Sequence, residues 1–289
     1  MRHILMVTLF MLLIIFNVAS GAHIPNTGDT KALKTYPNDA LRINGISGTP
    51  PPTNGTWNIS DKTIVENTIL SLNGSIRILS GGTLIIQNST IYFNMNSSLQ
   101  YEIIVENNGN LTILNSTIAS LDERYCYRIM VDFHGFVFIK NSTIKNIGYQ
   151  NIPGIAILSN SSYIFNSTIK SESTAILLNN SHHNIISNNT IVSNIYGIYL
   201  LNSTNNTITN NTLSSVQGIL LNISLNNAVS NNTFSGGGIQ IWGPENAFNN
   251  TVENNNINSK NIIYLYAKEN ITISNAGQII IALSHNISI

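Results

Sequence analysis

Aliphatic residues recur along the chain at a long, regular interval. Eight β-branched residues form one series, and an asparagine follows each of them two residues later. The aliphatic series is Ile86, Ile113, Ile139, Ile164, Ile186, Ile208, Val229 and Val252. The asparagines are Asn88, Asn115, Asn141, Asn166, Asn188, Asn210, Asn231 and Asn254, about 21 to 27 residues apart. Such a period is typical of a solenoid in which successive coils stack on one another.

Within each repeat, the alternation of apolar and polar residues predicts about three short strands. In the repeat at 191–213 the strands fall near 197–200 and 206–209, and glycine or asparagine occupies the corners. No period near 3.6 residues is sustained, so we expect parallel strands rather than helices. The sequence therefore predicts an all-β, single-stranded parallel β-helix at 57–289, with about ten coils stacked ~4.8 Å apart.

Two further series align with the repeat and are predicted to face the interior. The first is Ile155, Ile176, Ile198, Ile219, Ile239 and Ile263. The second lies two residues further on: Ile157, Leu178, Leu200, Leu221, Ile241 and Leu265. Asparagine tolerates the left-handed backbone that corners need, and stacked amides can bond from coil to coil. We therefore expect asparagine ladders at the corners, including a second one at Asn184, Asn206, Asn227 and Asn250.

The first 22 residues predict a secretory signal peptide. Arg2 and His3 precede an apolar run at 4–16, and small residues follow at 19–22. An uncleaved membrane anchor is the alternative, but the run is shorter than the ~20 residues that a span needs. Residues 23–56 are rich in glycine and proline and predict a linker or loosely ordered lead-in. We expect a secreted or cell-surface protein.

Charge and cysteine content narrow the classes of function. Only 9% of residues are charged and the formal net charge is zero, so no basic stripe is available for nucleic acid. Cys126 is the only cysteine, and stability must come from stacking rather than from disulfides. A lone thiol of this kind is more often a packed small hydrophobe than a nucleophile.

Residues 175–289 resemble a known repeat family. They are similar to NosD-like β-helix repeats of archaeal surface proteins. The similarity lies in glycine-isoleucine, asparagine-isoleucine and paired-asparagine elements and in the stretches at 275–280 and 286–289. That family is grouped with carbohydrate-binding proteins and sugar hydrolases of the pectin-lyase-like fold. The resemblance implies a right-handed helix. It does not name a reaction, because the matching residues are the ones that build the coil.

A charged cluster supplies the candidate catalytic residues. Aligning the repeats on their asparagines places Glu102 beside Arg128 and Glu106 beside Asp132, all facing outward. Two carboxylates on adjacent strands approach the ~5 Å separation that a retaining glycosidase uses. Glu106 and Asp132 are therefore the candidate acid and nucleophile, with Arg128 and His134 nearby. The alternative is a set of solvated ion pairs of small energetic value.

Other chemistries of this fold find no support in the sequence. Neither the aspartate cluster of calcium-dependent pectate lyases nor the glycine-histidine-glycine element of galacturonases is present. Copper delivery would need clustered histidine, methionine or cysteine, and the only close pair, His182 and His183, points to opposite faces of a strand. We expect no metal site and no cofactor.

One outward column is a candidate binding surface. It contains Ala156, Leu177, Tyr199, Leu220, Gln240 and Tyr264, and Trp242 lies close by. Tyr199, Leu220, Gln240, Trp242 and Tyr264 could stack on sugar rings or cover a protein partner. Alternatively, a loop or the lead-in segment folds over the column.

Glycosylation and assembly complete the expectations. The repeat itself places threonine two residues after most corner asparagines, so many of its sequons have a structural origin. Asn54, Asn58 and Asn96 lie outside the ladders and are the favoured glycan acceptors.

The pattern also continues to Ile289 without a polar cap, which suggests end-to-end stacking of chains.

Three functions follow as hypotheses. The first is a non-catalytic protein that presents a rigid surface to a glycan or a cell-surface protein. The second is a glycoside hydrolase or lyase that uses Glu106 and Asp132. The third is a structural subunit that assembles by coil stacking.

Overall fold

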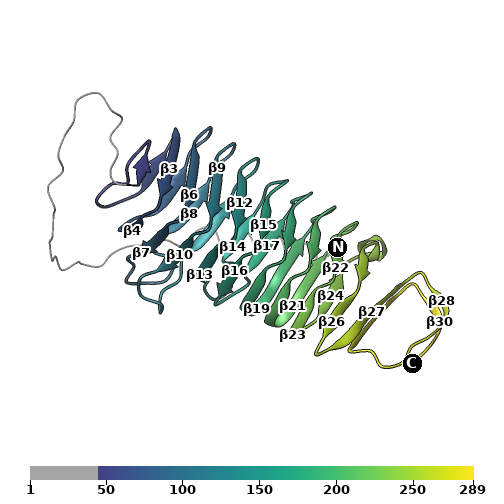
Figure 1. Cartoon of the computed structure of the whole chain (residues 1–289). Coiled ribbons are helices and arrows are strands. Elements are labelled where there is room, and N and C mark those ends of the chain that lie inside the picture. The colour runs from purple at the N-terminus through teal and green to yellow at the C-terminus, as the bar shows by residue number, and fades with distance from the viewer. Residues whose placement is uncertain (1–44) are drawn as a thin grey trace. The chain divides into compact units, whose positions relative to one another are not determined.

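The chain winds into a stack of nine turns, each built from three short strands (Figure 1). The structure is a computed structural model and describes residues 45–289. The predicted signal peptide and residues 23–44 of the predicted lead-in lie outside the described residues. Three faces run along the stack, and each turn contributes one strand to each face.

The strands of each face are parallel and in register with their neighbours. Face 1 contains β2 (Trp57–Ile59), β5 (Ile76–Ile78), β8 (Glu102–Val105), β11 (Arg128–Val131), β14 (Ile155–Ile157), β17 (Ile176–Asn179), the second halves of β19 (Thr190–Leu201) and β21 (Thr212–Asn222), and β24 (Ile239–Trp242). Face 2 contains β3 (Lys62–Glu66), β6 (Thr83–Gln87), β9 (Asn110–Leu114), β12 (Phe136–Lys140), β15 (Tyr163–Phe165), β18 (Ile185–Ser187), β20 (Thr207–Thr209), β22 (Ala228–Ser230) and β25 (Thr251–Glu253). Face 3 contains β4 (Ile69–Leu72), β7 (Thr90–Phe93), β10 (Thr117–Ser120), β13 (Thr143–Ile147), β16 (Thr168–Ser171), the first halves of β19 and β21, β23 (Thr233–Gly236) and β26 (Asn255–Ile257).

The predicted aliphatic series of face 2 forms a continuous interior column. Each member from Ile86 to Val252 is the direct register partner of the next, and Val65 extends the column at its start. These side chains are buried. Burying one such residue stabilises the fold by roughly 1.5–3 kcal/mol, but a single turn leaves its core exposed on both sides. The stack rather than the turn is therefore the folding unit.

The eight anchor asparagines occupy corners in the left-handed backbone region, with φ between +48° and +57°. Their predicted conformation is confirmed, but most of them do not form a ladder. Amide-to-amide bonds join only Asn115 to Asn88 and Asn141 to Asn115 along this column. The buried ladder is formed instead by the residue after each anchor: Ser89, Ser116, Ser142, Ser167, Asn189, Asn211, Asn232 and Asn255.

The second predicted ladder is confirmed. The backbone N–H of Asn184 donates to Asn206 Oδ1, that of Asn206 to Asn227 Oδ1, and that of Asn227 to Asn250 Oδ1, each with a donor–acceptor distance of 2.9 Å. The side-chain amides repeat the same connections. Because this corner is shut off from water, the asparagines satisfy backbone groups that would otherwise be unpaired.

Beyond the ninth turn the regular pattern ends, so the solenoid has nine turns rather than about ten. β26 pairs antiparallel with β27 (Lys260–Tyr266), which pairs in parallel with β29 (Gln278–Ala282). β28 (Glu269–Thr272) pairs in parallel with β30 (His285–Ser288). Ile263, expected above Ile239, instead pairs with Ile279. The side-chain amide of Gln278 bonds both the N–H and the carbonyl oxygen of Ile239, in the place of a tenth strand.

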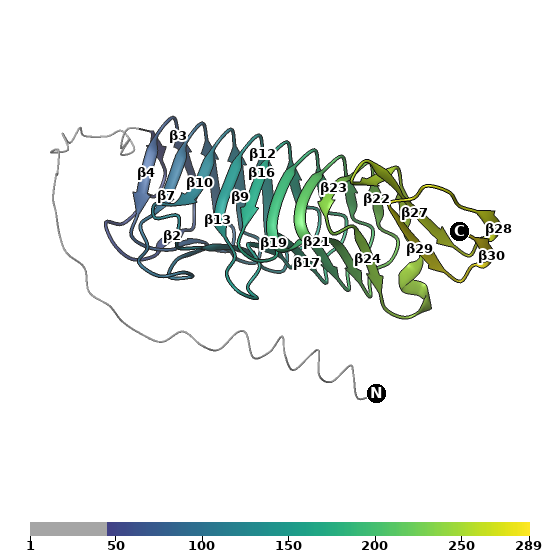
Figure 2. The ribbon, with the colours of Figure 1, turned by 90° about the horizontal axis from the view of Figure 1, so that it is seen from below.

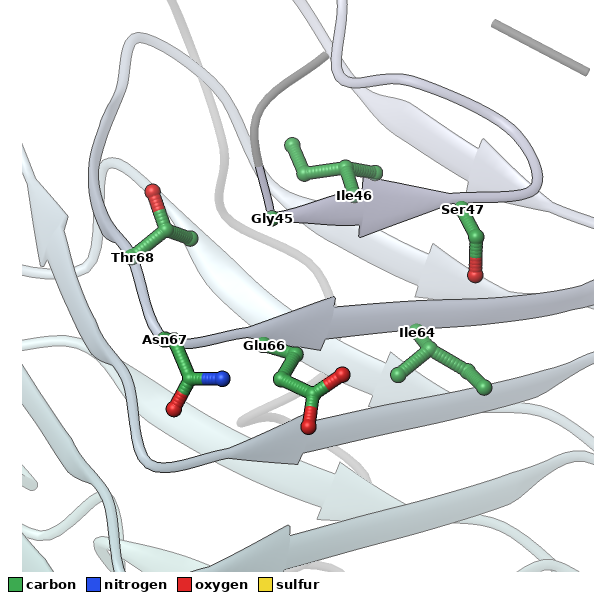
Figure 3. A pocket seen from close by; sticks show the side chains of 7 residues that line it. All are labelled: Gly45, Ile46, Ser47, Ile64, Glu66, Asn67 and Thr68. Atoms are coloured by element: carbon green, nitrogen blue, oxygen red, sulfur yellow. The ribbon is translucent and has the colours of Figure 1, made fainter. Parts of the chain in front are cut away.

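At the opposite end, part of the predicted lead-in joins the fold. β1 (Ile46–Ser47) pairs antiparallel with β3, and Ile46 is buried in the core. An open cavity of about 320 Å³ is lined by residues of these two strands and the corner after β3 (Figure 3). Its lining is Gly45, Ile46, Ser47, Ile64, Glu66, Asn67 and Thr68. The first turn therefore carries an antiparallel strand across its edge.

Candidate functional site

The outer surface of face 1 collects most of the residues singled out by the sequence. Its middle outward column is in continuous register: Arg77, Ile104, Met130, Ala156, Leu177, Tyr199, Leu220 and Gln240. Tyr264 is not a member, because β27 leaves the parallel stack. The predicted column is thus one surface from Ala156 to Gln240.

Burial along this column is uneven. Leu220 is only 2% exposed, and Ala156 and Leu177 are each 8% exposed, although all three point outward. Stacked side chains lie only ~4.8 Å apart, so each ring or branched chain shields its neighbours. Tyr199 lies between Leu177 and Leu220 and is itself partly exposed. A ligand would therefore meet Tyr199 and Gln240 rather than Leu220.

Polar and aromatic groups that the sequence analysis did not single out flank Tyr199. The rings of Tyr196 and Tyr199 lie 5.4 Å apart, and the Asn222 side-chain amide donates to the Tyr199 hydroxyl over 3.0 Å. Gln240 Nε2 lies 3.4 Å from Gln217 Oε1. Aligning the repeats could have identified these residues, since Tyr196 on β19 and Gln217 on β21 are direct register partners.

A bend at glycine places these tyrosines on the surface. β19 and β21 each run without a break from face 3 to face 1, and the register shifts between Ser193 and Tyr196. A Cβ on Gly197 would lie 2.6 Å from Leu213 Cδ2 and 3.0 Å from the carbonyl oxygen of Gly218, so a larger side chain there would force its neighbours to shift. The tight bend leaves Tyr196 and Tyr199 on the outer side of the same strand.

Two aromatic residues lie at the margin of this surface. Trp242 ends β24 and is 53% exposed, whereas Trp57 in the first turn is buried. Tyr264 packs against the core, its hydroxyl bonds the carbonyl oxygen of Phe248, and burial raises its pKa to about 12. Of the five predicted binding residues, Tyr199, Gln240 and Trp242 are therefore available on face 1.

The charged cluster occupies the same face, nearer the first turn. Arg128 Nε lies 2.6 Å from Glu102 Oε2, and Arg77 Nε lies 2.5 Å from Glu106 Oε1. Register confirms that Glu102 lies beside Arg128, and Glu106 and Asp132 directly follow the paired residues Val105 and Val131. Arg128 is engaged with Glu102. All four groups are partly exposed, so each pair contributes little to stability.

Asp132 is electrostatically distinct within this cluster. Partial burial raises its pKa, and the neighbouring Glu106 raises it further, while Arg77 and Arg128 lower it. His134 lies two residues later at an exposed corner with φ of +57°. A carboxyl with a raised pKa beside a second carboxyl can act as a proton donor. Glu106 and Asp132 follow adjacent strands of face 1, and neither lines either of the two cavities.

The second cavity has a volume of about 510 Å³ and lies at the loops between faces 3 and 1. Its lining is Glu123, Arg124, Cys126, Tyr149, Gln150 and Glu172. Burial raises the pKa of the Cys126 thiol to about 11, with a smaller contribution from Glu172. At neutral pH this thiol is protonated and a poor nucleophile.

Residues 45–289 hold no group of three or more histidine, cysteine, aspartate or glutamate residues that could bind a metal ion. No helix in this part of the chain is long and apolar enough to cross a membrane.

The favoured glycosylation sites Asn54, Asn58 and Asn96 are all exposed. The anchor asparagines of the repeat are exposed as well, because the residue after each anchor is the buried one. Burial therefore does not separate the two groups of sequons.

Comparison with known proteins supports the fold. Residues 153–277 match the family model described as a right handed beta helix region. No curated protein and no solved structure matches the chain. Together with the parallel register of nine turns, the family match identifies a right-handed parallel β-helix.

Proposed function

We propose that this right-handed parallel β-helix is a secreted or cell-surface protein that binds a glycan without catalysis along the outer surface of face 1. The observation that carries the proposal is the grouping of Tyr196, Tyr199 and Trp242 with side-chain amides on adjacent strands. Aromatic rings stack on the apolar faces of sugars, and amides bond to their hydroxyls. The resemblance to NosD-like repeats and the predicted signal peptide support the proposal.

The geometry favours an extended ligand. Trp242 lies two strands beyond the strand of Tyr199, which separates their positions by ~10 Å along the stack. The strand between them, β21, carries the side-chain amides of Gln217 and Asn222, and the strand of Trp242, β24, carries that of Gln240. Two sugar units could therefore be contacted at once by a surface whose backbone is held by neighbouring strands and, at β24, by the Gln278 side chain.

Binding of the full-length protein to a glycan array tests the proposal. Trp242 is exposed and Trp57 is buried, so binding should quench the fluorescence of Trp242. Tyr199→Ala and Trp242→Ala should each weaken binding roughly tenfold, because each removes one stacking contact worth ~1–2 kcal/mol.

A matched control is available on another face. Tyr163 on β15 also points outward, and its ring packs against Phe136 and Phe138. Tyr163→Ala should leave glycan binding unchanged. If no glycan binds, or if only Tyr163→Ala abolishes binding, the proposed site on face 1 is wrong. A protein ligand on the same surface would show instead as binding to cell-surface extracts but to no glycan.

Asp132 supports a second candidate function, a glycoside hydrolase or lyase. Its pKa is raised, and its neighbour Glu106 forms an ion pair with Arg77. Any polysaccharide-cleaving activity of the purified protein should then be lost in Glu106→Gln and in Asp132→Asn. Activity that survives both substitutions would exclude this site.

A further inference from the structure

One corner of face 1 carries a side chain that its backbone conformation disfavours. Ile223 directly follows β21 and has φ of +51°. A β-branched residue in the left-handed region is a genuine outlier, because its Cβ substituents crowd the backbone. Among residues 45–289, Ile223 is the only β-branched residue with a positive φ.

The equivalent positions in neighbouring turns show what the fold itself prefers. Asn180 and Asn202 occupy this corner in the two preceding turns, and Gly243 occupies it in the next. The side-chain amide of Asn202 donates to Asn180 Oδ1, and Ile223 cannot continue that ladder. The isoleucine side chain is 44% exposed, so burial offsets little of the strain. Stability alone therefore does not explain Ile223.

The position of Ile223 suggests another reason. Its N–H donates to the carbonyl oxygen of Trp242 over 2.7 Å, so the two residues lie on adjacent strands at the same corner. A Cβ on Gly243 would lie 2.8 Å from Ala247 Cβ and 3.2 Å from the Cα of Ile223, so the glycine lets these segments approach one another closely. The following loop is enlarged and contains the helical turn η2 (Glu245–Phe248), which projects beside β24 (Figure 2).

The charge of this part of face 1 limits the ligand. From Ala156 to Trp242, the strands of face 1 contain no aspartate, glutamate, lysine or arginine. Amide and tyrosine groups supply the polar contacts instead. Such a surface is complementary to an uncharged sugar, and its strands offer no cationic partner for a uronate or sulfate.

We propose that Ile223 is a ligand-contacting residue, whose aliphatic side chain and the Trp242 ring together cover the apolar face of a neutral hexopyranose at one end of the bound glycan. The inference rests on the proposed function. Backbone strain persists where the surrounding structure holds it, and it concentrates at ligand-binding positions. Ile223 is thus a residue retained for recognition at a cost to the fold.

The test replaces Ile223 by the residue that the preceding turns use. Ile223→Asn should raise the thermal unfolding midpoint, because asparagine tolerates the left-handed region. It should also weaken binding of the full-length protein to neutral hexasaccharides of glucose, mannose or N-acetylglucosamine by roughly five- to tenfold, through loss of an aliphatic contact. His183→Asn is the matched control, since His183 is an exposed corner residue with φ of +58° three turns before β24. It should leave binding unchanged.

The outcomes separate this inference from the proposed function. Ile223→Asn that binds as tightly as the unmodified protein overturns the role of Ile223 but leaves the glycan site intact. A lower unfolding midpoint in Ile223→Asn overturns the premise of strain, and the inference with it. If the unmodified protein binds none of these hexasaccharides, or binds them while Tyr199→Ala and Trp242→Ala are without effect, the proposed function itself fails.

Discussion

The buried amide ladder offers the sharpest test of how this fold is stabilised. Asn211 lies in the seventh turn and is 1% exposed. Its Oδ1 accepts from both the N–H and the side-chain amide of Asn189, each over 3.0 Å. Its Nδ2 donates to the carbonyl oxygen of Ile186 over 2.9 Å and to Asn232 Oδ1 over 3.0 Å. One side chain thus connects three consecutive turns.

The cost of Asn211→Ala follows from these contacts. The substitution removes four hydrogen bonds and leaves the buried N–H of Asn189 without its partner. A hydrogen bond contributes ~1 kcal/mol net, and a stranded buried group costs ~1–3 kcal/mol. We therefore expect a loss of ~3–5 kcal/mol in the free energy of unfolding, a large share of the ~5–15 kcal/mol typical of a folded domain. Asn211→Ser should cost less, because serine fills the equivalent position in four earlier turns.

Ser193 provides a matched control within the same core. Its Oγ is buried and has no hydrogen-bond partner in the described structure. Ser193→Ala should be neutral or stabilising by up to ~1 kcal/mol, because it removes a desolvated hydroxyl. Urea unfolding followed by circular dichroism measures both variants, with comparison restricted to variants of equal m-value. Hydrogen exchange locates the weakened turn.

Equal stability of Asn211→Ala and Ser193→Ala would refute the reasoning. A loss below ~1 kcal/mol in Asn211→Ala would do the same, because the stranded N–H of Asn189 alone should exceed it. If Asn211→Ala lost protection against hydrogen exchange only near the seventh turn, with an unchanged urea midpoint, neighbouring turns would unfold independently rather than as one stack.

Three further predictions concern packing, charge and modification. Gly197→Ala should destabilise the fold by ~1–3 kcal/mol, because its Cβ would lie 2.6 Å from Leu213 Cδ2; an unchanged urea midpoint would contradict this. Since the pKa of Asp132 is raised in the folded state, the native protein gains stability as the pH falls from above that pKa to the ordinary aspartate value. Asp132→Asn should therefore raise the unfolding midpoint at pH 7 and make stability less dependent on pH. Parallel pH profiles of the two proteins would exclude the effect. If the exported protein carries N-glycans, its intact mass should fall on substitution of the exposed asparagines Asn54, Asn58 or Asn96 by glutamine; an unchanged mass would exclude them as acceptors.

The register of the core could be read from the sequence residue by residue. The column from Ile86 to Val252 is where the period places it, because parallel coils of equal pattern can hide their aliphatic residues only when they align. The anchor asparagines also take the expected left-handed corners. The buried ladder was misplaced by one residue, because anchor and neighbour are both polar and the pattern does not show which one points inward.

The candidate surfaces were predicted less completely. Alignment on the anchors placed Glu102 beside Arg128, but it did not show that Arg77 from the preceding turn takes Glu106 as its partner. Alternation marked Leu220 as outward, which it is, yet stacking between neighbours leaves it 2% exposed. Exposure depends on the sizes of side chains in adjacent turns, and alternation within one strand carries no information about them.

The sequence by itself determined the stack, because a repeated pattern of aliphatic residues and left-handed corners has a single economical solution in parallel coils. The tertiary structure alone decided where that repetition stops. β27 turns back antiparallel on β26, and Gln278 takes the hydrogen bonds of a missing strand at Ile239. It also decided which polar groups meet on face 1, as with Tyr199 and Asn222. Both depend on contacts between residues of different turns, whose geometry is fixed only once the chain has folded.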